Sequence, residues 1–204
     1  MTTPIKTVAF DLGGVLLDWN PRHLYRQLLP TEAAVERFLA EVCTPDWNAT
    51  LDAGRPFQDA IAELLAKHPE QAELIEAYRS RWPEMLGGCF TETLDVMRRL
   101  RAEGFPIYAL SNWSAETFAA TRDQFPFLDE FDGILLSGEV GVSKPDPVIF
   151  ERFLERFGLL AESTVFIDDS AANVAVARSM RINAILFLDA ARLEQDLRAL
   201  GLPV

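Results

Sequence analysis

Short apolar runs that each end at a polar residue recur along the chain and predict the strands of a sheet. The runs are Thr7–Phe10, Ile107–Leu110, Ile134–Leu136, Thr164–Ile167 and Ala184–Leu188. Strands that are apolar almost without interruption are buried on both faces, which is typical of parallel sheets. The pattern therefore predicts a parallel sheet in the interior of the protein.

Helical periodicity fills the intervals between most of these runs. Apolar residues three and four positions apart predict helices over Thr91–Glu103, Pro147–Phe157, Ala171–Met180 and Ala190–Leu200. Ser170 suits the N-cap of the third helix, and a glycine follows each of the other three. Strands that alternate with helices in this way predict an α/β fold with a doubly wound, Rossmann-like parallel sheet.

A long stretch after the first predicted strand does not follow this alternation. Residues 18–88 show helical patterns separated by turn signals at prolines, and they contain three of the four tryptophans. The simplest arrangement is an all-helical lobe inserted after the first strand. We therefore predict two domains, an α/β core formed by residues 1–17 and 89–204 and a helical cap formed by residues 18–88.

Composition and charge limit the partners of such a protein. The chain has 204 residues, 49% of them apolar, which suffices for one domain with an inserted lobe. Acidic residues number 31 against 19 basic ones, giving a net charge of −12, and such a surface repels nucleic acid and anionic lipid. No signal-peptide core is present at the N-terminus, and no apolar run reaches the roughly 20 residues that span a bilayer. We expect a cytoplasmic protein that binds neither nucleic acid nor membrane.

Polar side chains collect at one edge of the predicted sheet, where ligands of open parallel sheets bind. The residues that follow the predicted strands at that edge are Asp11, Ser111, Asn112, Ser137, Asp168 and Asp169, and Lys144 lies in a loop that leads back to it. At any single position, a strand-end Asp or Ser is explained better as a cap of a loop or helix. Their coincidence at several strand ends favours a site.

The chemistry of these residues is consistent with phosphoryl transfer. Three clustered carboxylates, from Asp11, Asp168 and Asp169, repel one another and favour a hard cation, and their oxygen ligands indicate Mg²⁺. Lys144 and the Ser111 hydroxyl beside that cation would form a phosphate cradle. Asp11 is then both a metal ligand and a candidate nucleophile.

Four segments resemble the ordered motifs of the haloacid dehalogenase (HAD) superfamily. They are FDLGGVLLD at Phe10–Asp18, LSN at Leu110–Asn112, KPDPVIF at Lys144–Phe150 and FIDDSAAN at Phe166–Asn173. The inserted segment resembles the small helical C1 cap of the type I members. The resemblance implies a Mg²⁺-dependent phosphatase that hydrolyses a small phosphorylated metabolite through an aspartyl-phosphate intermediate.

The same resemblance assigns roles at the phosphate. Asp11 matches the nucleophile, and Lys144 matches the cation that offsets its charge. Ser111, helped by the Asn112 amide, matches the group that holds the phosphoryl oxygens. We expect the main chain at Gly13-Gly14 to approach the phosphate as well, since no side chain blocks it.

Four residues match the metal site of the superfamily. Asp169 matches the usual direct ligand and Asp168 its partner, next to Asp11 and the carbonyl of Gly13. These residues come from the first and the fourth motif, so the predicted site joins two strands.

The chain departs from the phosphatase pattern at Gly13. Those enzymes usually carry a second aspartate two positions after the nucleophile as general acid and base, although some phosphatases of this subgroup also have glycine there. A positioned acid contributes about 10²–10⁴ in rate. We expect a substrate with a good leaving group, such as a sugar 1-phosphate or acyl phosphate, or one that donates its own proton. Asp18 and water are the other candidate proton carriers.

Two alternatives remain open from the sequence. A 2-haloacid dehalogenase attacks through the same aspartate without a metal, but such enzymes usually have an aromatic residue near position 13 and lack the carboxylate pair of the fourth motif. A non-catalytic HAD-like binding protein is favoured by Gly13 alone. Asp11, Lys144 and the Asp168-Asp169 pair argue against it.

We expect residues at the cleft between cap and core to select the substrate. The candidates for contact with substrate are Asp18, Trp19, Asn20, Arg22, Trp47 and Trp113. Tryptophans more often pack in a core, so we expect only one or two of them to touch a ligand. The sequence favours no particular substrate, and it is equally consistent with a monomer and with a small homo-oligomer.

Overall fold

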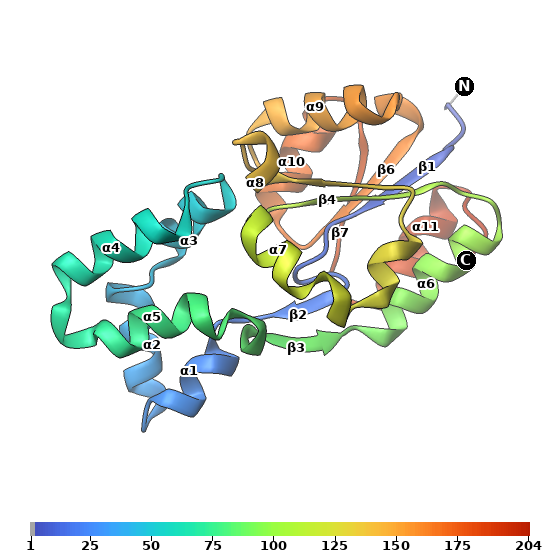
Figure 1. The fold of residues 1–204 in the computed structure, drawn as a ribbon. Coiled ribbons are helices and arrows are strands. Elements are labelled where there is room, and N and C mark those ends of the chain that lie inside the picture. Colours follow the sequence, from blue (N-terminus) through green and yellow to red (C-terminus); the bar gives the residue numbers. More distant parts are fainter. Residues whose placement is uncertain (1–2) are drawn as a thin grey trace.

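The computed structural model describes residues 3–204 and contains the predicted parallel sheet (Figure 1). Its strands are β1 (Thr7–Phe10), β4 (Ile107–Ser111), β5 (Gly133–Leu136), β6 (Thr164–Asp168) and β7 (Asn183–Leu186). They lie in the order β5-β4-β1-β6-β7, and all neighbouring pairs are parallel. The prediction of a doubly wound α/β fold is confirmed.

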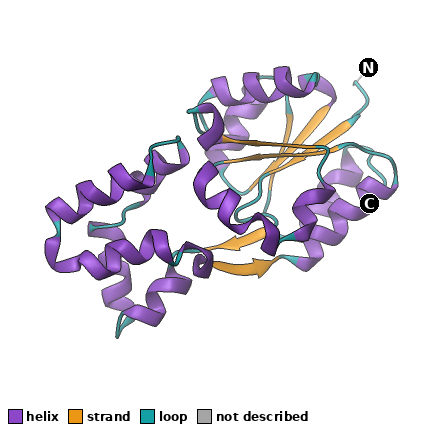
Figure 2. Cartoon of the chain, in the orientation of Figure 1, coloured by secondary structure: helices purple, strands orange, loops and turns teal. Residues whose placement is uncertain are grey.

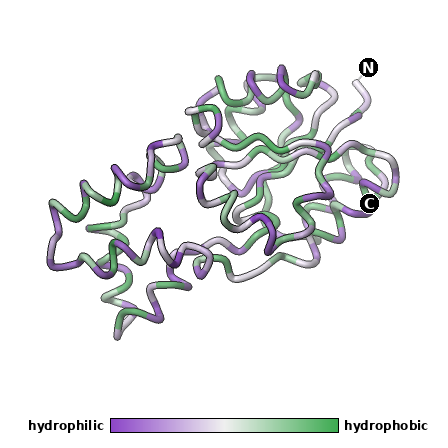
Figure 3. Tube along the Cα trace, viewed as in Figure 1, coloured by the Kyte–Doolittle hydropathy of each residue, from purple (hydrophilic) through white to green (hydrophobic). Residues whose placement is uncertain are grey.

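The sheet is buried on both faces because its side chains alternate between two apolar layers. Val8 and Phe10 belong to the layer that also holds apolar side chains of α6 (Thr91–Ala102) and α11 (Ala190–Ala199). Ala9 belongs to the opposite layer, with side chains of α9 (Pro147–Phe157) and α10 (Ala171–Ser179). Figure 3 shows the strands as hydrophobic segments between helices of mixed polarity.

The four predicted helices of the core are confirmed to within one residue at their ends. Ser170 caps α10 and Asp146 caps α9, each through its side chain. The remaining helical elements of the core were not predicted because they are short: α7 (Ala115–Thr121), α8 (Ser137–Val140), η3 (Arg122–Gln124), η4 (Pro126–Glu130) and η5 (Ala161–Ser163).

The inserted lobe consists of helices, drawn purple on the left of Figure 2. They are α1 (Arg22–Leu28), α2 (Glu32–Glu41), α3 (Pro45–Asp52), α4 (Phe57–Lys67), η1 (Pro69–Gln71), α5 (Ala72–Ser80) and η2 (Trp82–Met85). Thr31 and Thr44 cap α2 and α3 by accepting hydrogen bonds from main-chain N–H groups. The aromatic rings of Tyr25, Phe38 and Tyr78 are buried in its centre.

Two short antiparallel strands, β2 (Leu17–Trp19) and β3 (Leu86–Cys89), connect the lobe to the core. Neither was predicted, because each is too short for an alternating pattern and β3 contains Gly87 and Gly88. The proposed boundaries after residues 17 and 88 fall inside these strands, so the division into two domains remains a proposal. None of the helices within residues 3–204 combines the length and the hydrophobicity that a bilayer crossing needs.

Candidate active site

Three carboxylates meet at the carboxyl ends of β1 and β6. The two strands are neighbours, with Phe10 paired to Ile167, so the residues that follow them share one edge of the sheet. One carboxylate oxygen from each of Asp11, Asp168 and Asp169 lies within 4.8 Å of the others. The structure thus brings together the acidic cluster that the sequence predicted.

Lys144 is the buried cation of this cluster. Its Nζ lies 2.9 Å from Asp11 Oδ2 and 2.8 Å from Asp168 Oδ2. It also donates a hydrogen bond of 2.8 Å to the carbonyl of Leu110. All three N–H groups of the ammonium therefore have an acceptor, and its side chain is completely buried.

Neighbouring side chains hold Lys144 in place. The Asn112 carboxamide donates to the Lys144 carbonyl (2.9 Å) and accepts from the Lys144 N–H (2.8 Å). Asp168 accepts from the Ser170 N–H (2.8 Å) and from the Asn173 carboxamide (2.9 and 3.0 Å). Asn112 and Asp168 therefore hold Lys144 in position. Asp169, in contrast, is an exposed residue.

The charge balance of the site favours a cation. Burial, together with the charges of Asp168 and Asp169, raises the pKa of Asp11 to about 7 against the opposing effect of Lys144. Burial and the charge of Asp168 also raise the pKa of Asp169. Three carboxylates that face a single lysine fit a hard divalent ion, which Asp11 and Asp169 would hold with the carbonyl of Gly13.

Gly14 leaves the space that Asp169 occupies. Its backbone is in the left-handed region (φ +75°), and a Cβ on it would overlap the Asp169 carboxylate. We expect Gly14→Ala to weaken Mg²⁺ binding about 10–100-fold, the range found when the surroundings of a metal ligand are disturbed. Titration calorimetry with Mg²⁺ measures this.

Gly158→Ala is the matched control for this prediction. Gly158 shares the left-handed backbone (φ +64°), but a Cβ there would meet no atom within 4 Å. Both variants carry the same backbone strain, so only the overlap with Asp169 distinguishes them. Equal Mg²⁺ affinities of the two variants would contradict the assignment of Asp169 as a ligand of Mg²⁺.

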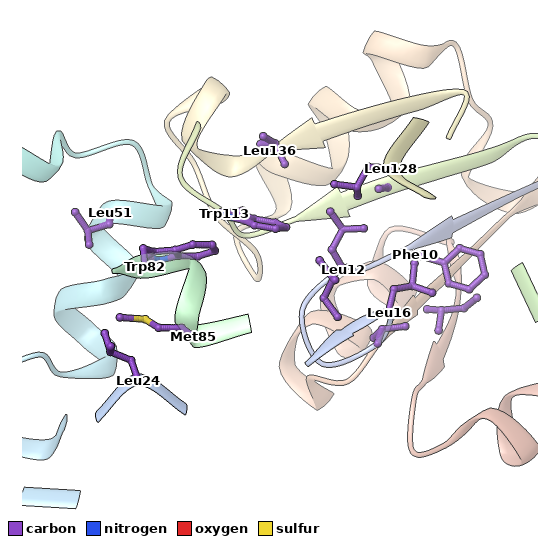
Figure 4. Close-up of a cluster of buried hydrophobic side chains, with 14 of the residues drawn as sticks. Phe10, Leu12, Leu16, Leu24, Leu51, Trp82, Met85, Trp113, Leu128 and Leu136 are labelled. Atoms are coloured by element: carbon purple, nitrogen blue, oxygen red, sulfur yellow. The ribbon is translucent and has the colours of Figure 1, made fainter. Parts of the chain in front are cut away.

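A cavity of about 60 Å³ lies beside the cluster, between lobe and core. Its lining residues are Gly13, Leu17, Trp19, Asn48, Asp52, Trp82, Leu86, Ser111, Asn112 and Trp113. Figure 4 shows Trp82 from the lobe next to Trp113 from the core. The centroids of the two rings are 5.4 Å apart. The cavity is therefore polar at the catalytic edge of the sheet and aromatic where the lobe closes over it.

Two of the three candidate tryptophans line this cavity, namely Trp19 and Trp113. The Trp113 Nε1–H donates to Thr117 (3.0 Å), which leaves its ring face toward Trp82. Trp47 instead packs in the lobe, where its Nε1–H donates to the Ala60 carbonyl. That only one or two tryptophans touch a ligand stays a prediction.

The candidate polar residues between the middle of β2 and the start of α1 lie outside the cavity. Asp18 Oδ2 is 2.9 Å from His23 Nε2, on the side of β2 opposite the cavity-lining Leu17 and Trp19. Asn20 accepts from the Arg22 N–H, and the Arg22 guanidinium forms a bidentate pair with Glu36. The structure therefore does not bring Asp18, Asn20 or Arg22 to the acidic cluster.

Sequence reasoning missed the lobe residues Asn48, Asp52 and Trp82. Asn48 and Asp52 have helical spacing and resemble an ordinary polar face of α3, so no local signal distinguishes them. Ser137 was noted only as a strand end. Its hydroxyl hydrogen-bonds the Asp52 carbonyl and thereby joins the lobe to the core.

Comparisons with known proteins agree with this geometry. The family of haloacid dehalogenase-like hydrolases matches residues 5–181. The sesquiterpene phosphatase astK of Aspergillus oryzae is 26% identical over 205 residues, which cover 98% of each chain. The D-ribitol-5-phosphate phosphatase of Bacteroides thetaiotaomicron is 23% identical and covers 86% of this chain and 88% of its own. A HAD family enzyme of the same bacterium, solved with magnesium and inorganic phosphate, superposes with a TM-score of 0.72 at 24% identity, over 93% of this chain and 98% of that one.

Proposed function

The chain belongs to the haloacid dehalogenase-like hydrolase family, and we propose that it is a Mg²⁺-dependent phosphatase of a small phosphate monoester. The observation that carries this proposal is the contact of buried Lys144 with Asp11 inside a cluster of three carboxylates. The names of two similar proteins, both phosphatases, support it. The magnesium and inorganic phosphate bound by a protein of the same fold also support this proposal.

In the proposed reaction, Asp11 is the nucleophile. Its carboxylate attacks phosphorus, the bond to the ester oxygen breaks, and an aspartyl-phosphate forms. Water then attacks the phosphorus, releases phosphate and restores the carboxylate. Bound Mg²⁺ would supply positive charge that offsets the charge of the phosphoryl oxygens.

The other residues of the site position the reacting groups and stabilise their negative charge. Lys144 neutralises negative charge on Asp11, and Asn112 and Asp168 fix the lysine through the bonds described above. Ser111 ends β4 at the cavity and is placed to donate its hydroxyl to a phosphoryl oxygen. Lys144 is held in place before the substrate arrives, which is how such groups contribute most to rate.

A metal-independent dehalogenase accounts less well for the same residues. Halide leaves without protonation and without help from a metal, so Asp169 beside Asp11 would only add repulsion. A non-catalytic binding protein leaves the costly burial of Lys144 between Asp11 and Asp168 unexplained.

We expect the protein to release phosphate from a panel of phosphate monoesters with Mg²⁺ and to stop when EDTA is added. Colorimetric detection of phosphate measures this, and Mg²⁺ in excess of the chelator should restore the rate. A parallel assay with 2-chloropropionate in EDTA follows halide release. Halide release, or no phosphate release from any ester, would overturn the proposed function.

A further inference from the structure

Because position 13 is a glycine, the residue that usually serves as general acid and base is absent from that position. An alkyl ester oxygen that departs from phosphorus must receive a proton, and the water that attacks later must lose one. Among the described residues that line the cavity, Asp52 is the one carboxylic acid. It comes from the lobe, whereas all members of the acidic cluster come from the core.

We propose that Asp52 is the general acid and base of the reaction, delivered by the helical lobe in place of a core residue at position 13. This inference rests on the proposed phosphatase function and adds a catalytic residue to it.

The main chain of Asp52 is fixed to the catalytic edge of the core. Asp52 ends α3, and its carbonyl accepts a hydrogen bond from the hydroxyl of Ser137, the residue that follows β5. Ser137 Oγ also accepts from the Trp113 N–H at 3.0 Å. The lobe backbone at Asp52 is therefore tied to two strand ends that border the site.

The Asp52 side chain is oriented by neutral partners. The Asn48 carboxamide donates to Asp52 Oδ2 at 2.9 Å, and the Tyr78 hydroxyl donates to Asn48 Oδ1 at 2.7 Å. Across residues 3–204, Asp52 takes part in no ion pair. An acid held by neutral groups can gain and lose a proton without breaking a salt bridge.

The surroundings of Asp52 suit proton transfer near neutral pH. Burial and the charge of Asp11 together raise the pKa of Asp52 to about 7, against the opposing effect of the Asn48 hydrogen bond. Asp11 from the core and Tyr78 from α5 are the titratable groups that face it. A catalytic acid works best when its pKa lies near the working pH.

Protons balance over the two steps. In the first step, the ester oxygen leaves phosphorus and takes the proton of the Asp52 carboxyl while Asp11 gains the phosphoryl group. In the second, the Asp52 carboxylate takes a proton from water, the water oxygen bonds to phosphorus, and the bond to Asp11 breaks. Asp52 ends protonated, as it began, and the net reaction is ester hydrolysis.

Leaving-group dependence tests this role. The measured quantity is kcat/KM, which reports the steps up to loss of the leaving group. Asp52→Asn is expected to lower kcat/KM for an alkyl phosphate about 10²–10⁴-fold. It should change kcat/KM for 2,4-dinitrophenyl phosphate only a few-fold, because dinitrophenolate departs without a proton. Equal losses on the two esters would overturn the role of Asp52.

Asp46→Asn is the matched control, since Asp46 is an exposed residue in the first turn of the same helix. It should behave as the unmodified protein on both esters. The two proposals fail differently: no hydrolysis of dinitrophenyl phosphate by the unmodified protein would overturn both, whereas uniform loss in Asp52→Asn would overturn the role of Asp52 alone.

A second variant makes the test independent of how well Asp52→Asn folds. A Cβ at Gly13 would meet nothing closer than Trp19 Cβ at 3.9 Å, and the Gly13 backbone is not left-handed, so the backbone at this position accepts a residue with a Cβ. In a Gly13→Asp background, the cost of Asp52→Asn on the alkyl ester should fall below about 10-fold. The same cost in both backgrounds would overturn the proposal.

Discussion

Asp11→Asn is expected to reduce phosphate release at least about 10⁴-fold on every ester, including 2,4-dinitrophenyl phosphate. The carboxamide has nearly the shape of the carboxylate but is a poor nucleophile, so the covalent intermediate cannot form. The hydrogen bond from the Leu12 N–H to Asp11 Oδ1 can persist in the variant. Initial rates with a malachite-green phosphate assay measure the loss.

A binding measurement separates lost chemistry from lost structure. With Mg²⁺ present, BeF₃⁻ is expected to attach to Asp11 as a mimic of the aspartyl-phosphate and to raise the melting temperature of the unmodified protein but not of Asp11→Asn. Asp95→Asn, an exposed change on α6, should retain both activity and the response to BeF₃⁻. Activity in Asp11→Asn above about 1% of the original would argue against a covalent mechanism on Asp11.

The core was readable from sequence because its strands satisfy one simple physical rule. A strand buried on both faces is apolar almost without interruption, and Thr7–Phe10 or Thr164–Ile167 show this without any knowledge of their neighbours. The polar residue after each strand then marks the edge where ligands bind. Asp11 and the aspartates at the end of β6 were predictable by this rule, and Lys144 by the loop that leads back to the same edge; the structure brings them together.

The residues that the lobe contributes to the site could not be predicted from the sequence, because their position depends on how the lobe packs against the core. Asp52 reaches the cavity through the contact of its carbonyl with Ser137, a residue far away in sequence. Asp18 was a candidate for the site because it lies in the first motif. The alternation of side chains along β2, however, points it away from the cavity. Trp47 was a candidate for substrate contact by residue type alone, and its burial in the lobe follows from packing against Tyr78.

Lys144 illustrates why one residue can matter for both stability and activity. The Lys144→Met variant keeps the length of the side chain but removes the charge that faces Asp11 Oδ2, Asp168 Oδ2 and the Leu110 carbonyl. Loss of one partner of a buried ion pair leaves an uncompensated charge and destabilises a protein by about 3–5 kcal/mol. We expect a loss of this size in urea unfolding at pH 8 with EDTA present. Phosphate release should fall as well, because Lys144 no longer neutralises Asp11.

The deficit of Lys144→Met should depend on pH in a defined direction. Burial already raises the pKa of Asp11 from 3.8 to about 7 with the lysine present, and its removal raises the folded-state pKa further. Below about pH 7 both folded proteins hold the Asp11 proton that the unfolded chain releases above about pH 4, whereas between pH 7 and the higher pKa of the variant only the folded variant holds it. The deficit is therefore full above the folded-state pKa of Asp11 in the variant and shrinks as the pH falls toward 7. Lys67→Met, which removes an exposed partner of Glu63, should cost at most about 1 kcal/mol. A deficit in Lys144→Met that is equally small, or that grows as the pH falls, would contradict the buried charge balance on which the proposed nucleophile depends.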